Sequence, residues 1–177
     1  MPDKFSNKYR INTHRWREHN YKFGIYHVTL CTHSRQYSFG LIKEENASAQ
    51  MIYNRLGEYV RQEIENTEKV RDGMHVSIPL YVVMPNHVHL VICIDDQQAE
   101  DATNQEFGFQ SRNLASVIRG IKSKVTSFAH KNGFSDFSWQ SGYYDRVVRN
   151  EKELNLLAEY IENNVEKWSL DKYCLDK

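Results

Sequence analysis

Two histidines stand one residue apart in the stretch 81–92, which reads YVVMPNHVHLVI. Side chains alternate between the two faces of an extended strand, so His87 and His89 share one face. Their Cα atoms would lie roughly 7 Å apart, which lets two neutral imidazoles ligate one divalent ion. The spacing therefore indicates a metal site, although two polar residues on a solvated sheet face would show the same pattern. A third ligand and a reacting group must come from elsewhere in the chain.

Tyr160 and Asn164 are the candidates for these two roles. They stand four residues apart in EKELNLLAEYIENNVEKW, where apolar residues recur at the spacing of a helix from about 151 to 168. Residues at this spacing are neighbours on a helix surface, so a hydroxyl nucleophile and a carbonyl ligand could address one metal ion. The spacing is equally compatible with a packing tyrosine and a polar residue at a helix end. It leaves both interpretations open.

The elements that must position these residues follow from hydrophobic periodicity. We expect a strand at 26–32, an amphipathic helix from 46 to about 70, strands at 74–84 and 87–94, a helix at 113–133, an extended segment at 137–149 and the last helix. This order predicts an α+β fold with a ferredoxin-like or RRM-like antiparallel sheet, helices on one face, and an added C-terminal helix that carries the tyrosine. The opposite sheet face would be free, and the histidines would point there.

Length and composition are typical of one globular domain. The chain has 177 residues, of which 40% are apolar and 26% charged, and we expect a single domain over 1–177. Residues 1–24 would form a basic N-terminal arm, and residues 95–108 a flexible acidic loop. We expect neither a signal peptide nor a membrane helix, which places the protein in the cytoplasm. The odd number of scattered cysteines argues against a disulfide framework or a thiolate zinc site.

Charge is segregated along a chain whose formal net charge is zero. Basic side chains predominate in the first 43 residues and between 109 and 149, whereas acidic side chains collect in 44–72, in the 95–108 loop and in the last helix. Such segregation is typical of a local phosphate-binding face, and a solvated surface can also produce it.

Several of these motifs occur together in one known family. The stretches MPNHVHLVI, WQSGYYDRVVRNEKEL and YIENN, with a helix after the first, resemble the IS200-like transposases, and more specifically the REP-associated tyrosine transposases, from about 26 to 168. The resemblance implies an HUH-type single-stranded DNA endonuclease and strand transferase. It assigns His87, His89 and Asn164 as ligands of a divalent metal ion and Tyr160 as the nucleophile that forms a 5′-phosphotyrosine intermediate. Mg²⁺ or Mn²⁺ suits this oxygen-rich substrate, and imidazole ligands favour Mn²⁺.

The expected partner is single-stranded DNA that contains a hairpin, which would bring the protein to the nucleoid. Basic residues interleaved with aromatic rings suit a flexible single strand, and they predict a DNA path along Arg119, Lys122, Trp139, Tyr143, Arg146 and Arg149. In the alternative interpretation, Arg146 and Arg149 only pair with acidic residues of the last helix. The sequence leaves monomer and homodimer open.

Two other functions compete with strand transfer. One is a non-catalytic module that binds single-stranded nucleic acid on the aromatic residues of its sheet. The other is a metal-dependent hydrolase of a small phosphoester, which would need neither the basic tracts nor the tyrosine. A covalent adduct between protein and DNA separates the first function from both. Tyr143 and Tyr144 rival Tyr160 as nucleophile, but their expected extended segment offers no ligand at helical spacing.

Overall fold

The computed structural model describes residues 4–5, 9–10, 23–45, 48–70, 75–95 and 113–174. The strands are β1 (Lys4–Phe5), β2 (Tyr9–Arg10), β3 (Phe23–Cys31), β4 (Gly40–Glu45), β5 (Ser48–Tyr53), β6 (Val76–Val83), β7 (His87–Asp95) and β8 (Tyr144–Val147). The α-helices are α1 (Arg55–Val70), α2 (Leu114–Lys131) and α3 (Glu151–Glu162), and short 3₁₀ turns occupy η1 (His33–Arg35) and η5 (Trp168–Leu170).

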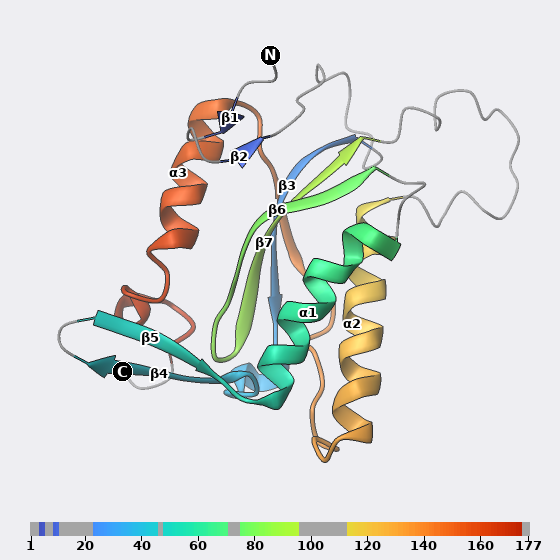
Figure 1. Cartoon of the computed structure of the whole chain (residues 1–177), viewed down its shortest axis with the longest axis vertical. Helices are drawn as coiled ribbons and strands as arrows, with labels where there is room; N and C mark the ends of the chain where they lie inside the picture. Colours follow the sequence, from blue (N-terminus) through green and yellow to red (C-terminus); the bar gives the residue numbers. More distant parts are fainter. Residues whose placement is uncertain are drawn as a thin grey trace, which may run out of the picture.

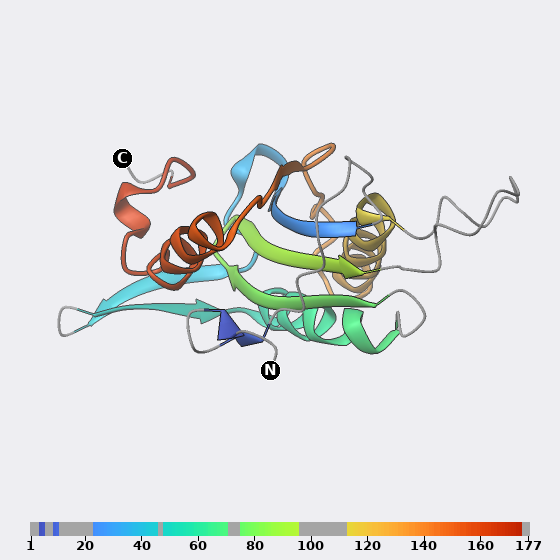
Figure 2. The ribbon, with the colours of Figure 1, turned by 90° about the horizontal axis from the view of Figure 1, so that it is seen from above.

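The central sheet has the strand order β6-β7-β3-β8, and all of its pairings are antiparallel. Helix α1 connects β3 to β6, by way of the β4–β5 hairpin, and helix α2 connects β7 to β8. Figures 1 and 2 show α1 and α2 together on one side of the sheet and α3 on the other. This arrangement confirms the predicted α+β fold with its ferredoxin-like order and added C-terminal helix.

The strands bury side chains on both faces. On the side of α1 and α2, the core contains Val88, Leu90 and Ile92 of β7 together with residues of both helices such as Ile64 and Ile121. On the other side, a smaller cluster joins Val91 of β7 to α3. The alternation predicted for 87–92 is therefore confirmed, because period two is a local property of any strand.

An ion pair between a partly exposed lysine and a buried carboxylate ties the two covering helices together. Nζ of Lys124 on α2 lies 2.7 Å from Oε1 of Glu63 on α1, and the Glu63 side chain is almost fully buried. Burying a carboxylate is costly unless it is paired, so Lys124 makes the polar position in this interface tolerable.

The prediction that a helix begins at residue 46 is wrong. Residues 48–53 form β5, which pairs with β4 in a hairpin, and the helix begins only at Arg55. The physical signal is Asn54, whose Oδ1 accepts hydrogen bonds from the backbone N–H groups of Leu56 and Gly57 at 2.9 Å, as an N-cap does. Gly57 also lets the helix approach closely, since a Cβ there would lie 2.1 Å from the carbonyl oxygen of Phe39.

The last helix is also shorter than predicted. It ends at Glu162, and Asn163 follows as its C-cap, so Asn164 lies beyond the helix rather than within it. The chain then turns and places Trp168, Tyr173 and Cys174 in a cluster with Cys31 and Met84. We call residues 163–174 the C-terminal segment. Together with α3 it covers the face that carries the histidines, which corrects the expectation that this face is free.

Two predicted regions lie largely outside the described residues. Of the basic arm at 1–24, the structure describes the paired strands β1 and β2 and the first residues of β3, and of the loop at 95–108 it describes only Asp95. Among the described helices, none has the length and apolar character needed to cross a membrane.

Candidate metal centre and its tyrosine

The two histidines lie side by side on β7, deep under α3 and the C-terminal segment. His87 is 0% exposed and His89 is 2% exposed, so the interpretation as polar residues on a solvated face is wrong. Their Nε2 atoms are 3.1 Å apart. On the adjacent strand β3, Cys31 pairs with His87 and Thr29 pairs with His89, so these two residues lie on the same sheet face as the histidines. The structure thus directs two imidazole nitrogens at a single point.

Asn86 fixes the orientation of the His87 ring. The side-chain amide of Asn86 donates to the carbonyl oxygens of Arg35, at 3.0 Å, and Tyr173, at 2.8 Å. Its Oδ1 must therefore be the atom that faces Nδ1 of His87 at 2.9 Å, and His87 donates from Nδ1. The lone pair of Nε2 is consequently directed at His89. An outer partner that sets the tautomer in this way is a regular feature of histidines that bind metals.

His89 makes contacts that permit two arrangements of its proton. Its Nδ1 lies 3.0 Å from Oγ1 of Thr29 and 3.1 Å from Nε2 of His27. In one arrangement Thr29 donates to Nδ1, and the Nε2–H of His89 donates to His87. In the other, Nδ1–H donates to Thr29 or His27, and the Nε2 lone pairs of both histidines meet. The second arrangement is the one in which both rings can ligate one metal ion.

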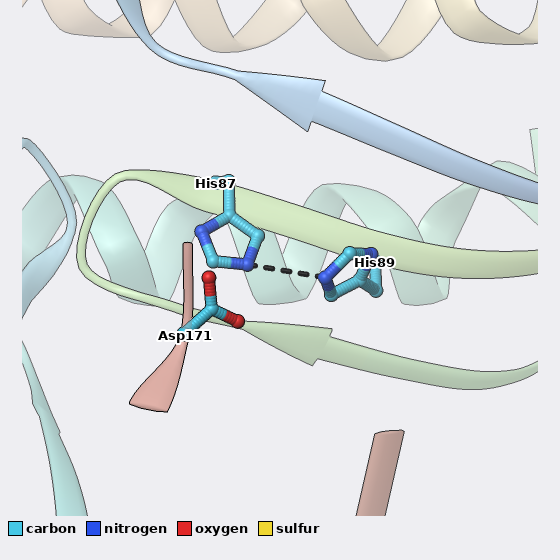
Figure 3. A group of neighbouring side chains, drawn as sticks. All are labelled: His87, His89 and Asp171. Carbon is cyan, nitrogen blue, oxygen red and sulfur yellow. Dashed lines mark hydrogen bonds between the residues drawn. The ribbon is translucent and has the colours of Figure 1, made fainter. Parts of the chain in front are cut away.

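A carboxylate completes a set of three donors. Asp171 belongs to the C-terminal segment. One of its carboxylate oxygens and one ring nitrogen from each of His87 and His89 all lie within 4.8 Å of one another. Figure 3 shows its carboxylate pointing toward the His87 ring. Two imidazoles and a carboxylate suit Mn²⁺, Mg²⁺ or another divalent ion. The residues present therefore fit a divalent metal ion, whose identity they do not set.

Tyr160 of α3 reaches the same point from above the sheet. Its hydroxyl oxygen lies 3.2 Å from Nε2 of His89, and the residue is 43% exposed. Burial raises the pKa of the Tyr160 hydroxyl, the amide of Asn164 opposes this change, and the carboxylate of Asp171 adds to it. The hydroxyl is therefore protonated at neutral pH, half open to solvent and next to the metal donors.

Asn164 is buried beside Tyr160 with one polar atom unpaired. It is 3% exposed, and within the described part of the chain its Oδ1 has no hydrogen-bond partner. A buried amide oxygen without a partner costs stability, so it is a natural place for a ligand. Its assignment as a metal ligand stays a prediction. Hydrogen bonding by its amide lowers the pKa of the Tyr160 hydroxyl, against the effect of burial.

The surroundings keep the histidines neutral. Burial, with the positive charges of Lys172 and Arg35, lowers the pKa of His87 to about 3. Burial and the neighbouring imidazoles of His87 and His27 lower the pKa of His89 to about 2. Neutral imidazole is the form that binds metal ions, so the rings are in the ligating state at neutral pH without any change of protonation.

Backbone strain accompanies this network. Ser34 and Arg35 have positive φ values of 52° and 55°, a conformation that costs energy in residues other than glycine. The same turn carries the carbonyl oxygen of Arg35 that receives the Asn86 amide. Strain in η1 thus coincides with the contact that sets the His87 tautomer.

The residues predicted to form a DNA path are spread over several environments. Arg119 is exposed on α2, the helix that covers the sheet face opposite the histidines. Lys122 donates to the carbonyl oxygens of Gln140 and Gly142, and the indole N–H of Trp139 donates to the carbonyl oxygen of Lys122. These contacts bring Lys122 and Trp139 together, although both are engaged within the protein.

Two further members of this set, Arg146 and Arg149, lie next to the tyrosine helix α3. Arg146 pairs with Glu153 of α3 at 3.2 Å, which matches the alternative interpretation, while its side chain stays 71% exposed. The backbone N–H of Arg149 donates to the same carboxylate. Tyr143 packs against the main core. DNA contact by any of these residues stays a prediction.

The sequence interpretation missed four residues of the site. Thr29 lies opposite His89 in the register of β3 and β7, and His27 lies two residues away on the same face of β3, a pattern that period two could have revealed. Asn86 stands directly before His87, but nothing in the sequence indicates its two carbonyl partners. Asp171 is more than 80 positions from the histidines in the sequence and belongs to no periodic pattern, so only the fold reveals it.

Comparison with known proteins places the chain in a family. No family model matches it. It is 33% identical over 183 residues to an uncharacterized protein of Haemophilus influenzae, with 96% of this chain and 98% of that protein covered. The chain belongs to the same family as this Haemophilus protein.

A solved structure has a similar fold to this chain. It is a REP-associated tyrosine transposase bound to a REP hairpin, with a TM-score of 0.51 and 20% sequence identity over 90% of this chain and 77% of the other. The fold is therefore that of a tyrosine transposase, as the sequence resemblance implied.

Proposed function

We propose that the protein is a metal-dependent transesterase of single-stranded DNA, which cleaves and rejoins a strand through a 5′-phosphotyrosine at Tyr160. The observation that carries the proposal is the 3.2 Å separation between the Tyr160 hydroxyl and Nε2 of His89, within the group of His87, His89 and Asp171. A nucleophile and metal donors at one point are the parts that this reaction needs. The transposase fold supports the same assignment.

His87 and His89 would hold the metal ion, with Asp171 or the unpaired Oδ1 of Asn164 as a further ligand. A bound Mg²⁺ or Mn²⁺ would polarise the phosphate and offset the negative charge that develops on its oxygens. Asn86, Thr29 and His27 orient the two imidazoles toward that ion. These contacts make the donor set rigid before substrate arrives, as positioned catalysis requires.

Tyr160 provides the covalent chemistry. Its hydroxyl oxygen forms a bond to phosphorus and loses its proton, the bond from phosphorus to the 3′ oxygen breaks, and that oxygen takes up a proton to become a free 3′-hydroxyl. The DNA remains attached through its 5′ phosphate. A phenol is a good enough leaving group for a 3′-hydroxyl to reverse the step and rejoin a strand.

The proposed substrate is single-stranded DNA that contains a hairpin, because the structural neighbour was solved with one. The exposed Arg146 side chain lies opposite His27 in the β3–β8 register, on the sheet face that carries the histidines. Among the predicted contact residues it is therefore best placed to meet a phosphate near Tyr160.

The deciding experiment incubates the protein with a labelled hairpin oligonucleotide and Mn²⁺ and separates the products on a denaturing gel. Wild-type protein should form a covalent adduct, and peptide mapping should locate the nucleotide on Tyr160. Tyr160→Phe should form none while still binding the DNA. Tyr59→Phe is the matched control, because Tyr59 stacks on Phe128 between α1 and α2, away from the site. An adduct on Tyr143 or Tyr144 would overturn the role of Tyr160, and binding without any adduct would favour a binding module.

A further inference from the structure

A cavity of about 130 Å³ lies next to the candidate metal centre. Thr29 and Cys31 of β3 form one wall, and residues 140–144 form the other. Thr29 also contacts Nδ1 of His89 at 3.0 Å, so the cavity and the metal centre share a wall. Whatever fills the cavity therefore lies close to a substrate that is bound at the histidines.

The lining of this cavity is neutral and suited to an aromatic ring. It includes the hydroxyl of Ser141, the carboxamide of Gln140 and the ring of Tyr144, which is 56% exposed. Tyr144 pairs with Thr29 in the register of β3 and β8, so its ring belongs to the sheet face of the histidines. Hydroxyl and amide groups beside an aromatic face are the means by which proteins hold an unstacked nucleobase, whereas a phosphate would call for cations.

Lys122 supports the loop that forms one wall of the cavity but does not line the cavity itself. Nζ of Lys122 donates to the carbonyl oxygens of Gln140 and Gly142, each at 2.8 Å, and thereby fixes the backbone of the loop. Gly142 has a φ of 72°, which favours glycine at this turn. A further hydrogen bond of 3.3 Å joins Nε2 of Gln140 to the hydroxyl of Tyr144. The wall is thus preformed, which lowers the entropic cost of binding a ligand.

The volume selects the size of the ring. A protein cavity of roughly 150 Å³ accepts benzene, so one of about 130 Å³ suits a single six-membered ring. A purine has two fused rings, so one of them would project from the open side of the cavity and lose the contacts of the lining. The size argument therefore favours pyrimidines.

We propose that this cavity binds one unstacked pyrimidine base of the DNA strand, next to the phosphate that Tyr160 attacks. The proposal rests on the proposed function for the identity of the polymer, and it adds a site that selects where the strand is cleaved. Tyr144 supplies the stacking face, and Gln140 and Ser141 supply hydrogen bonds to the edge of the base.

The test measures binding alone, so that it does not depend on the covalent chemistry. Fluorescein-labelled dT10 and dA10 are titrated with the full-length protein in EDTA, and anisotropy gives both dissociation constants. Wild-type protein should bind dT10 at least about fivefold more tightly than dA10, because adenine does not fit the cavity and loses its stacking on Tyr144, and stacking of one base on an aromatic ring contributes that much or more. Ser141→Trp, which fills the cavity, should remove this preference by weakening the binding of dT10.

Two further variants keep the result interpretable. Ser135→Trp places the same bulky ring on an exposed serine of the connection between α2 and β8, outside the cavity lining, and should retain the preference. Gln140→Ala removes the amide without filling the cavity and should weaken dT10 severalfold with little effect on dA10. Circular dichroism checks that each variant is folded.

The outcomes separate this proposal from the function on which it rests. Equal dT10 to dA10 ratios in wild-type protein and Ser141→Trp would overturn the cavity as a base site, even if the Tyr160 adduct forms. Loss of the ratio in Ser141→Trp but not in Ser135→Trp would support it, even if no adduct is found. Wild-type protein that binds neither oligonucleotide would overturn the base site, while the adduct assay with the hairpin oligonucleotide would still decide the proposed function.

Discussion

The hydroxyl oxygen of Tyr160 lies 3.2 Å from Nε2 of His89, although the two residues are 71 positions apart in the sequence. One belongs to the added helix α3 and the other to a central strand, so the pair forms only when α3 has packed on the sheet. The apolar cluster of Val91 with Leu154, Ala158 and Ile161 makes that packing specific. Hydrophobic burial therefore positions a group whose own chemistry is polar.

Asp171 should be needed for tight binding of a metal ion. Its carboxylate is the donor that turns two imidazoles into a set of three, so Asp171→Ala should weaken Mn²⁺ binding by at least about tenfold. Isothermal titration calorimetry with Mn²⁺ measures the effect directly. Glu159→Ala, an exposed acidic residue of α3, is the matched control and should bind Mn²⁺ as the wild type does. Unchanged affinity in Asp171→Ala would leave Asn164 as the stronger candidate ligand.

Asn86 should affect both stability and metal affinity, and two substitutions separate these effects. Asn86→Ala leaves the buried carbonyl of Tyr173 and Nδ1 of His87 without their partner, which should cost roughly 2–4 kcal/mol in unfolding free energy. Asn86→Asp also loses the amide donor, but it keeps an acceptor for Nδ1 of His87. It should therefore be destabilised yet bind Mn²⁺ more tightly than Asn86→Ala. Urea melts and calorimetry distinguish the two, and equal Mn²⁺ affinities would contradict the role of Asn86 in setting the tautomer.

The Glu63–Lys124 pair should stabilise the packing of α1 on α2. Lys124→Met leaves the buried carboxylate of Glu63 unpaired and should cost about 1–3 kcal/mol, since Lys124 itself is partly exposed and solvent can approach. The double variant Glu63→Met with Lys124→Met should recover most of that loss, because two apolar side chains leave no buried charge. A double variant less stable than Lys124→Met would show that Glu63 has another stabilising role.

Stability should fall below neutral pH because of the buried histidines. The pKa of His27 is lowered to about 4, mainly by burial, and the pKa values of His87 and His89 are lowered further. In the unfolded chain these histidines take up protons as the pH falls through about 6.5, the usual pKa of histidine. In the folded chain they stay neutral down to about pH 4. The unfolding free energy should therefore be constant above about pH 7 and decrease as the pH falls toward 4.

The slope of this decrease gives a direct check. Each neutral buried histidine should contribute about 1 kcal/mol per pH unit, as an order of magnitude, between pH 6 and 4. Denaturant melts at several pH values measure the slope, and His89→Gln should reduce it. His33→Gln, at an exposed position, is the matched control substitution. A wild-type stability that is independent of pH over this range would mean that the rings become protonated in the folded protein.

The sequence predicts this molecule best where the decisive physics is local. The alternation of His87 and His89 with Val88 and Leu90 follows from the pleat of one strand, and it placed the histidines on the correct face. The burial of that face depends on residues 163–174, whose path is set by long-range packing, and no periodicity reveals it.

The errors in the predicted bounds of the helices and strands have a similar origin. Met51, Ile52 and Tyr53 fit the stripe of a helix as well as the alternating pattern of β5, so short apolar spacing could not decide between them. The cap formed by Asn54 decides it in the structure. The family resemblance and the spacing to Asn164 predict Tyr160 as the nucleophile, and the fold brings both residues to one place even though the helix ends between them.

The position of Asp171 and Tyr173 in the chain has a consequence for biosynthesis. The ribosome produces the strands, the histidines and Tyr160 first, and the Asp171 carboxylate and the Tyr173 carbonyl that holds Asn86 emerge only afterwards. A chain that ends before residue 171 would therefore contain the strands of the sheet and α3 but would lack one donor and one support of the candidate metal centre. Such a chain would carry both imidazoles and the tyrosine without the carboxylate beside them.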